Sequence, residues 1–385
     1  MTSGLMLWLS LLIATAGAAG QQPAGNTPAG WPGPGARDVG FSVWLERDGS
    51  RPLNGAPRPV QVGCWYPARS RTGPALTYAD YFVLSESERD GRRLTEAERN
   101  AAIAAYEKLL VENGVSSGGF DAWFKTVCLA RRDAPPIDDA LPLVLVAQGN
   151  FHSLHHQAVL AEHLASHGYL VCSTPSQTRL SGPMQSEDDV TPNARAQAAD
   201  LQIARRAASA RFTVDGDRLG LVGHSFGSRS SLVLAALTNA TALVSLDGGI
   251  GGAQAKRWID QVPEIDLVRM RTPVLHLYED VEEFVTPDFE LFERMTGTRR
   301  LLVKIDGVRH MDFSGLGFVS AAITPLRPNL PPDFSRRVAA ITVYARAFLD
   351  ATMKKDAEAE RMLARTPAEN GFDGWVTVRE LRPER

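Results

Sequence analysis

The sequence has little cysteine, no surplus of basic residues and no apolar run long enough to cross a bilayer. Its 385 residues include only three cysteines, without a C-x-x-C or zinc-ligand spacing, which excludes a disulfide framework. Lys and Arg total 41 against 44 for Asp and Glu, a formal net charge of -3. Nucleic-acid-binding domains usually carry a basic face, so this balance argues against such a partner. No internal repeat is visible.

Residues 1–20 have the pattern of a secretory signal peptide. The apolar run from Leu5 to Ala16 is shorter than the about 20 residues that span a bilayer, and small residues follow it. No Lys or Arg precedes the run, and an uncleaved amphipathic anchor is the alternative. Residues 21–40, rich in Pro, Gly and Ala, are predicted to be a linker. We therefore expect a secreted or periplasmic protein without a stable membrane span.

Export would permit a disulfide, because secreted proteins meet an oxidising environment. An odd number of cysteines leaves one unpaired in any pairing. We expect all three to be buried small side chains: Cys64, Cys128 and Cys172.

From residue 41 onward, short apolar runs alternate with helical patterns at 155–167, 193–210, 228–237, 289–295 and 335–349. The later apolar runs lack alternation, which is typical of strands covered on both faces of a parallel sheet. The pattern predicts an α/β fold over 41–353, with a mostly parallel eight-stranded sheet and helices on both faces. The predicted strands are 41–45, 59–66, 141–147, 169–173, 219–223, 242–246, 273–278 and 300–305.

Two segments fall outside this alternation. Residues 76–135 carry a charged helical pattern and are predicted to be a helical insertion. This insertion either pads the sheet edge or caps the active site. The cap is supported by its aromatic residues Tyr78, Tyr81, Phe82, Phe120, Trp123 and Phe124. The second segment, residues 354–385, is predicted to be a polar tail ending in a β-like W-V-T-V.

A candidate nucleophile lies between a predicted strand and a helix. Residues 223–227 read G-H-S-F-G, the G-x-S-x-G pattern in its strand–turn–helix context. Glycines flank the serine because the turn is too sharp for side chains there. The helix N-terminus beneath the serine favours developing negative charge. We predict that Ser225 is a nucleophile.

Serine needs a base, and the base needs a carboxylate that orients it. Two histidines follow Ser225. His276 lies inside an apolar run and is expected to be a buried strand histidine, whereas His310 follows the last predicted strand on a loop and is assigned as the base. Asp247 and Asp280 both close strands, at the sheet edge where this class of fold places its chemistry. Position alone does not decide between them.

An oxyanion hole needs two backbone donors directed at the developing alkoxide. One is expected to be the amide of Phe226, which follows the nucleophile. The other is assigned to Asn150, which lies in the loop after the third predicted strand and follows Gly149.

These motifs resemble the platelet-activating-factor acetylhydrolase and dienelactone-hydrolase-like branch of the α/β hydrolases. The resemblance rests on G-H-S-F-G, S-L-D-G at 245–248, H-x-x-F at 310–313, L-A-S-H-G-Y at 164–169 and W-Y-P-A at 65–68. It implies an α/β-hydrolase fold and favours Asp247 as the acid. Gln148 stands where the branch usually has histidine, and Ser228 where it has a second glycine.

The resemblance implies a secreted serine hydrolase of carboxylic esters, with short-acyl or phospholipid-like substrates and no cofactor. Acyltransferase or thioesterase chemistry would use the same residues. A non-catalytic binding module is less favoured because no triad member is missing. His152 and His156, and likewise His163 and His167, have the i, i+4 spacing of metal ligands, but the H-E-x-x-H order is absent. We expect no metal; the sequence leaves the oligomeric state open.

Overall fold

The computed structural model describes residues 32–112, 115–323, 326–327 and 329–384. Its strands form one eleven-stranded sheet in the order β11-β10-β9-β8-β7-β5-β6-β2-β1-β4-β3, and those from β6 to β10 in this order are mutually parallel. Each of the eight predicted strands is present. They are β1 (Asp38–Leu53), β2 (Ala56–Ala68), β5 (Leu141–Ala147), β6 (Leu170–Thr174), β7 (Val214–His224), β8 (Ala242–Leu246), β9 (Val274–Tyr278) and β10 (Arg300–Ile305).

Three further strands correct the predicted number from eight to eleven. β3 (Ala75–Thr77) lies at the start of the segment for which the sequence predicts only helix, and β4 (Val127–Arg132) lies within it. β11 (Val376–Leu381) lies in the predicted polar tail and overlaps its β-like W-V-T-V. β11 pairs antiparallel with β10 at the sheet edge. Only the first residue of β11 is fully buried, so its sequence has no continuous apolar run.

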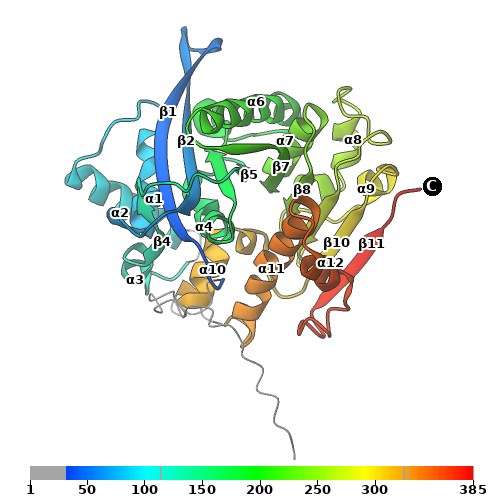
Figure 1. Cartoon of the computed structure of the whole chain (residues 1–385). Helices are drawn as coiled ribbons and strands as arrows, with labels where there is room; N and C mark the ends of the chain where they lie inside the picture. The colour runs from blue at the N-terminus through cyan, green and yellow to red at the C-terminus, as the bar shows by residue number, and fades with distance from the viewer. Residues whose placement is uncertain (1–31, 113–114, 324–325, 328, 385) are drawn as a thin grey trace, which may run out of the picture.

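Helices cover both faces of the sheet (Figure 1). The side chains of Leu143 and Leu145 pack into one core and those of Val144 and Val146 into the other, which explains why β5 is apolar throughout. The first core is completed by α6 (Val190–Ser209), α7 (Gly227–Ala236), α8 (Ala255–Ile259) and α9 (Glu290–Arg294). The second is completed by α4 (Ala158–Ser166), α10 (Gly315–Ala322), α11 (Phe334–Met353) and α12 (Ala357–Ala364). The predicted α/β-hydrolase fold is confirmed.

The insertion is anchored by its aromatic side chains. It contains α1 (Tyr78–Phe82), α2 (Glu96–Glu112) and α3 (Phe120–Phe124) between β3 and β4. α2 has no fully buried side chain among its described residues, and it packs on the core through the half-buried Ile103, Tyr106 and Leu110. All six aromatic residues noted in the sequence are buried in the core of the α4 face: Tyr78, Tyr81, Phe82, Phe120, Trp123 and Phe124.

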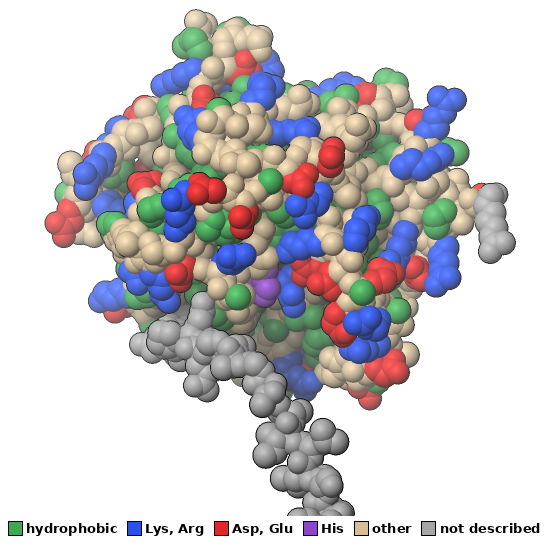
Figure 2. All heavy atoms as spheres, in the orientation of Figure 1, with side chains coloured by type: hydrophobic (Ala, Val, Ile, Leu, Met, Phe, Trp, Pro, Cys, Tyr) green, Lys and Arg blue, Asp and Glu red, His purple; other side chains and the backbone are tan. Residues whose placement is uncertain are grey.

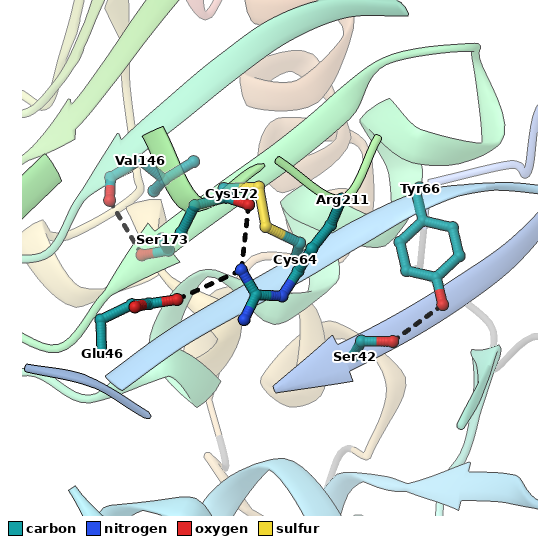
Figure 3. Close-up of a disulfide and its surroundings, with 9 residues drawn as sticks. Ser42, Glu46, Cys64, Tyr66, Val146, Cys172, Ser173 and Arg211 are labelled. Carbon is teal, nitrogen blue, oxygen red and sulfur yellow. Dashed lines mark hydrogen bonds and ion pairs between the residues drawn. A yellow bond between two sulfur atoms is a disulfide. The ribbon is translucent and has the colours of Figure 1, made fainter. Parts of the chain in front are cut away.

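Two of the three cysteines form a disulfide, which corrects the sequence prediction. Cys64 on β2 and Cys172 on β6 lie directly opposite in an antiparallel pair, with their Cα atoms 4.2 Å apart (Figure 3). Cys128 is free and buried, as expected. The bonded cysteines are 108 residues apart in sequence. Their pairing therefore depends on the register of two distant strands, which spacing along the chain does not reveal.

The predicted linker is only partly described. Residues 1–20, with the proposed signal peptide, and residues 21–31 lie outside the described part. Gly35 and Arg37 donate backbone hydrogen bonds to Ser166 at the end of α4, and β1 already begins at Asp38. β1 and β2 are joined by Asn54 and Gly55, both at positive φ, and their hairpin extends beyond the rest of the fold (Figure 1). None of the described helices is long and apolar enough for a membrane span.

Candidate active site

Ser225 lies at a sharp turn between β7 and α7. Its φ is 55°, in the left-handed region that non-glycine residues rarely adopt. A Cβ atom at Gly223 would lie 2.5 Å from the carbonyl oxygen of Gly227, and one at Gly227 would lie 2.2 Å from that of Ala147. No larger residue fits at either position without moving the backbone. The two glycines therefore allow the tight turn that places Ser225 between the end of β7 and the start of α7.

The structure brings Ser225, His310 and Asp247 together. The His310 Nε2 atom lies 2.9 Å from the Ser225 hydroxyl, and its Nδ1 atom lies 2.5 Å from an Asp247 carboxylate oxygen. A carboxylate only accepts hydrogen bonds, so the Nδ1 atom carries the proton and Nε2 is left to accept from the serine. His310 and Asp247 are both buried, which protects this arrangement from competition with water.

Asp280, the alternative acid, lies elsewhere. It is exposed, and its carboxylate accepts a hydrogen bond from the backbone of Gly307. The second carboxylate oxygen of Asp247 accepts from the backbone amide of Glu279 at 3.3 Å. Both carboxylate oxygens of Asp247 therefore accept hydrogen bonds, one from His310 and one from the backbone at the end of β9.

Two further side chains shape this site: Ser228, which the sequence marks only as a departure from an expected glycine, and Glu279. The Ser228 hydroxyl donates to the Ser225 carbonyl oxygen at 2.8 Å and accepts from the amide of Ile250 at 3.3 Å. It therefore joins the nucleophile turn to the loop that follows Asp247. A Cβ atom at Gly248 would lie 2.2 Å from the Ser245 hydroxyl and 2.3 Å from the Ser228 hydroxyl, so both serines require glycine there. A serine in place of the expected glycine was the only sequence signal.

Glu279 is a second buried carboxyl group beside Asp247. It accepts backbone hydrogen bonds from Val281, Glu282 and Glu283 and so folds the loop after β9. Burial raises its pKa, and the neighbouring Asp247 charge raises it further, against the effect of these hydrogen bonds. This loop places the exposed ring of Phe284 5.1 Å from the ring of His310. Apart from a carboxylate at a strand end, no feature of the sequence indicates this role.

The two predicted oxyanion amides belong to the nucleophile turn and to the loop after β5. Phe226 is the N-cap of α7, and Asn150 lies in the loop after β5. Among the described residues, neither backbone amide has a hydrogen-bond acceptor. The Asn150 side chain instead accepts from Met184, and the neighbouring Phe151 amide donates to Thr178. Both amides are thus free to donate to a substrate; their catalytic use stays a prediction.

The remaining histidines do not gather around a common ligand position. His276 is a buried strand residue, as expected, and contacts the Ser245 hydroxyl at 2.9 Å. His163 contacts the backbone carbonyl oxygen of Gly33 in the N-terminal segment, and His167 contacts that of His163 in α4. His152 and His156 stack face to face with ring centres 3.8 Å apart. Within the described ranges, no group of three or more His, Cys, Asp or Glu side chains is arranged to hold a metal ion.

The outer surface shows no preference for one sign of charge on the visible face. Basic and acidic side chains lie interspersed there (Figure 2). This agrees with the nearly balanced composition of the chain.

The structure is similar to that of a ferulic acid esterase from Streptomyces cinnamoneus. The TM-score is 0.62 at 20% sequence identity, over 93% of this chain and 98% of that chain. No protein-family model matches the sequence, and no curated protein resembles it closely enough to be matched. At this identity the likeness establishes the fold, which is the one that the sequence predicts.

Proposed function

We propose that the protein is a serine hydrolase of carboxylic esters that works through an acyl-enzyme. The observation that carries this proposal is the hydrogen-bonded series from the Ser225 hydroxyl through His310 to Asp247. Serine, imidazole and carboxylate in this order are the groups that convert a weak nucleophile into a reactive one.

In the proposed reaction, the Ser225 oxygen attacks the ester carbonyl carbon while His310 Nε2 takes the hydroxyl proton. Asp247 stabilises the imidazolium that forms. The amides of Asn150 and Phe226 donate to the oxyanion, and removing one such donor typically costs about 2.7–4 kcal/mol of barrier. His310 then protonates the leaving alcohol as the tetrahedral intermediate collapses. Water, activated by the same imidazole, releases the acid and regenerates the serine.

The substrate class is proposed on two grounds. The resemblance in the sequence favours short-acyl or phospholipid-like esters, and the structural neighbour adds esters of ferulic acid to the candidates. The fold alone does not choose among them, because unrelated substrates are processed on the same scaffold. We also propose that the protein is secreted or periplasmic, since the Cys64–Cys172 disulfide suits an oxidising compartment.

The first test replaces the nucleophile. Ser225→Ala should lower the turnover of p-nitrophenyl esters by at least ~10⁴-fold, because the attacking oxygen is lost. Alanine tolerates the turn no worse than serine, so the melting temperature should not fall. A fluorescent organophosphonate should label the wild type and not the variant. Retained turnover in Ser225→Ala would refute the proposal.

A further inference from the structure

A cavity of about 720 Å³ lies between the loop after β5 and helix α2 of the insertion. The loop contributes Asn150 and Phe151 to its lining. Six residues of α2 line the cavity, at the i, i+3, i+4, i+7, i+8, i+11 spacing of one helix face: Glu98, Ala101, Ala102, Ala105, Tyr106 and Leu109. Small alanine side chains on this face leave the space unfilled. Of the described residues around it, neither Ser225 nor His310 contributes to the lining.

The lining is apolar and carries no unpaired positive charge. Phe82, Leu94 and Tyr106 supply apolar surface. Its two arginines are both neutralised: Arg92 pairs with Glu98 at 2.8 Å, and Arg179 pairs with the buried Glu88 at 2.8 Å. A carboxylate or phosphate would find no free cation there.

Three histidines of the lining are also uncharged at neutral pH. Burial lowers the pKa of His155 to about 3, and it lowers the pKa values of His152 and His156 well below the usual range. Each of these rings is therefore a neutral aromatic surface. The lining therefore does not favour an anionic ligand.

Hydrogen bonds join the insertion to the loop after β5, and the cavity lies between these two segments. The buried Glu88 accepts a hydrogen bond from the Ser153 hydroxyl at 2.6 Å and from Arg179 at 2.8 Å. Arg179 also lies over the ring of Phe151, 4.8 Å from its centre. The insertion and the loop that carries Asn150 are thus held together by charge-assisted hydrogen bonds, which are among the stronger ones. The space between them is formed before a ligand binds.

The chemistry of the proposed reaction decides which half of the ester lies in this cavity. His310 must reach the leaving oxygen to protonate it, so the alcohol lies on the His310 side, beside Phe284. Asn150 donates to the carbonyl oxygen and at the same time lines the cavity. We propose that this cavity binds the acyl group of the ester and selects bulky, uncharged acyl groups over acetyl. This inference rests on the proposed function and narrows its substrate range.

The test fills the cavity from α2. Ala105 lines the cavity and its neighbour Ala104 does not, although both side chains are exposed. The measured quantity is the kcat/KM for p-nitrophenyl 3-phenylpropanoate divided by that for p-nitrophenyl acetate. The wild type should favour the phenylpropanoate, and Ala105→Trp should lower this ratio at least ~10-fold. Ala104→Trp is the matched control, because it has the same helix-propensity cost, and its ratio should stay within about twofold of the wild-type value.

A binding measurement separates this inference from the proposed catalysis. We expect 3-phenylpropanamide, an uncharged amide of the same acyl group, to bind Ser225→Ala by calorimetry and to lose affinity when Ala105→Trp is added. Suppose that the amide binds Ser225→Ala and loses affinity in the Ala105→Trp variant, but that the wild type hydrolyses neither ester. This result would support the cavity as a binding site and refute the proposed esterase activity. Hydrolysis with an unchanged substrate ratio in Ala105→Trp, or a wild type that favours acetate, would overturn the cavity assignment.

Discussion

His224, the residue before the nucleophile, holds the main chain of the proposed base. Its Nε2 atom lies 3.1 Å from the carbonyl oxygen of His310. A carbonyl oxygen only accepts, so this nitrogen carries the proton and Nδ1 has the lone pair. Burial, followed by the charge that His310 can carry, lowers the pKa of His224 well below its usual value. His224 is therefore a neutral donor that fixes the position from which His310 reaches Ser225.

Replacing this donor should misplace the base. His224→Phe keeps an aromatic ring but removes the hydrogen bond, and we expect kcat to fall about 100-fold, the typical effect of a misplacement near 1 Å. His224→Gln retains an N–H donor and should recover part of the loss. Steady-state kinetics on a p-nitrophenyl ester measures both. If the two variants lose activity equally, or neither does, then the hydrogen bond does not position His310.

The acid is tested by a matched pair of substitutions. Asp247→Asn should lower kcat about 10⁴-fold, because an amide no longer favours the tautomer with a proton on Nδ1. Asp280→Asn should change kcat less than about threefold, since Asp280 is exposed and contacts Gly307 rather than His310. A larger loss at Asp280 than at Asp247 would contradict the arrangement seen in the structure.

Sequence reasoning at the residue scale succeeds where the constraint is local. The turn at Ser225 could be predicted because its neighbouring glycines are demanded by contacts of 2.5 Å or less within a few residues or with the adjacent strand. The choice between Asp247 and Asp280 could not be made from spacing, because both end parallel strands at the same sheet edge. Which of them meets His310 depends on the path of the loop after β10, and that path is a property of the folded chain.

At the scale of secondary-structure elements, the disulfide fastens two strands that contribute little other pairing. β2 and β6 are joined through only three residue pairs, and the Cys64–Cys172 bond lies at the middle one. Cross-linking residues 108 apart restricts the unfolded chain, which typically stabilises a protein by about 2–4 kcal/mol.

The double variant Cys64→Ala/Cys172→Ala should therefore lose about 2–4 kcal/mol of unfolding free energy in denaturant titrations. A reductant that opens the bond should destabilise the wild type in the same way and leave the double variant unchanged. Cys128→Ala removes a free, buried thiol and serves as the control, because its sensitivity to reductant should match that of the wild type. Equal sensitivity of the double variant and the wild type would contradict the disulfide.

Strands that are buried on both faces could be located from the sequence, whereas partly exposed strands could not. The central strands could be located because both faces are covered, so their sequences are unbroken apolar runs. β4, next to the edge strand β3, and β11, at the opposite edge, each mix buried and exposed positions, and their pairing partners are supplied by tertiary structure. The helical pattern of α2 was visible, but the small strands on either side of the insertion had no comparable signal.

On the scale of the whole molecule, buried neutral histidines should set its response to acid. Burial lowers the pKa of seven of them. The pKa falls to about 3 for His155 and His163 and to about 4 for His276, and it lies well below the usual range for His152, His156 and His224 and below the usual value for His167. The unfolded chain takes up protons at these positions as the pH falls through about 6.5, while the folded chain does not. The unfolding free energy therefore falls on acidification. Buried carboxyl groups with raised pKa values oppose part of this loss, among them Glu88, Glu162 and Asp312.

His155 isolates this effect, because neither of its ring nitrogens has a partner among the described residues and aromatic rings surround it. His155→Phe should fit the site, and it removes one group that binds a proton in the unfolded chain but not in the folded chain. Between pH 6 and 4, the unfolding free energy of the variant should fall with a slope smaller by about 1.4 kcal/mol per pH unit than that of the wild type. Tyr106→Phe, which changes a neighbouring ring that does not titrate in this range, should leave the slope unchanged. Parallel slopes for His155→Phe and the wild type would mean that His155 already binds a proton in the folded protein, and that the wall of the proposed acyl cavity is charged.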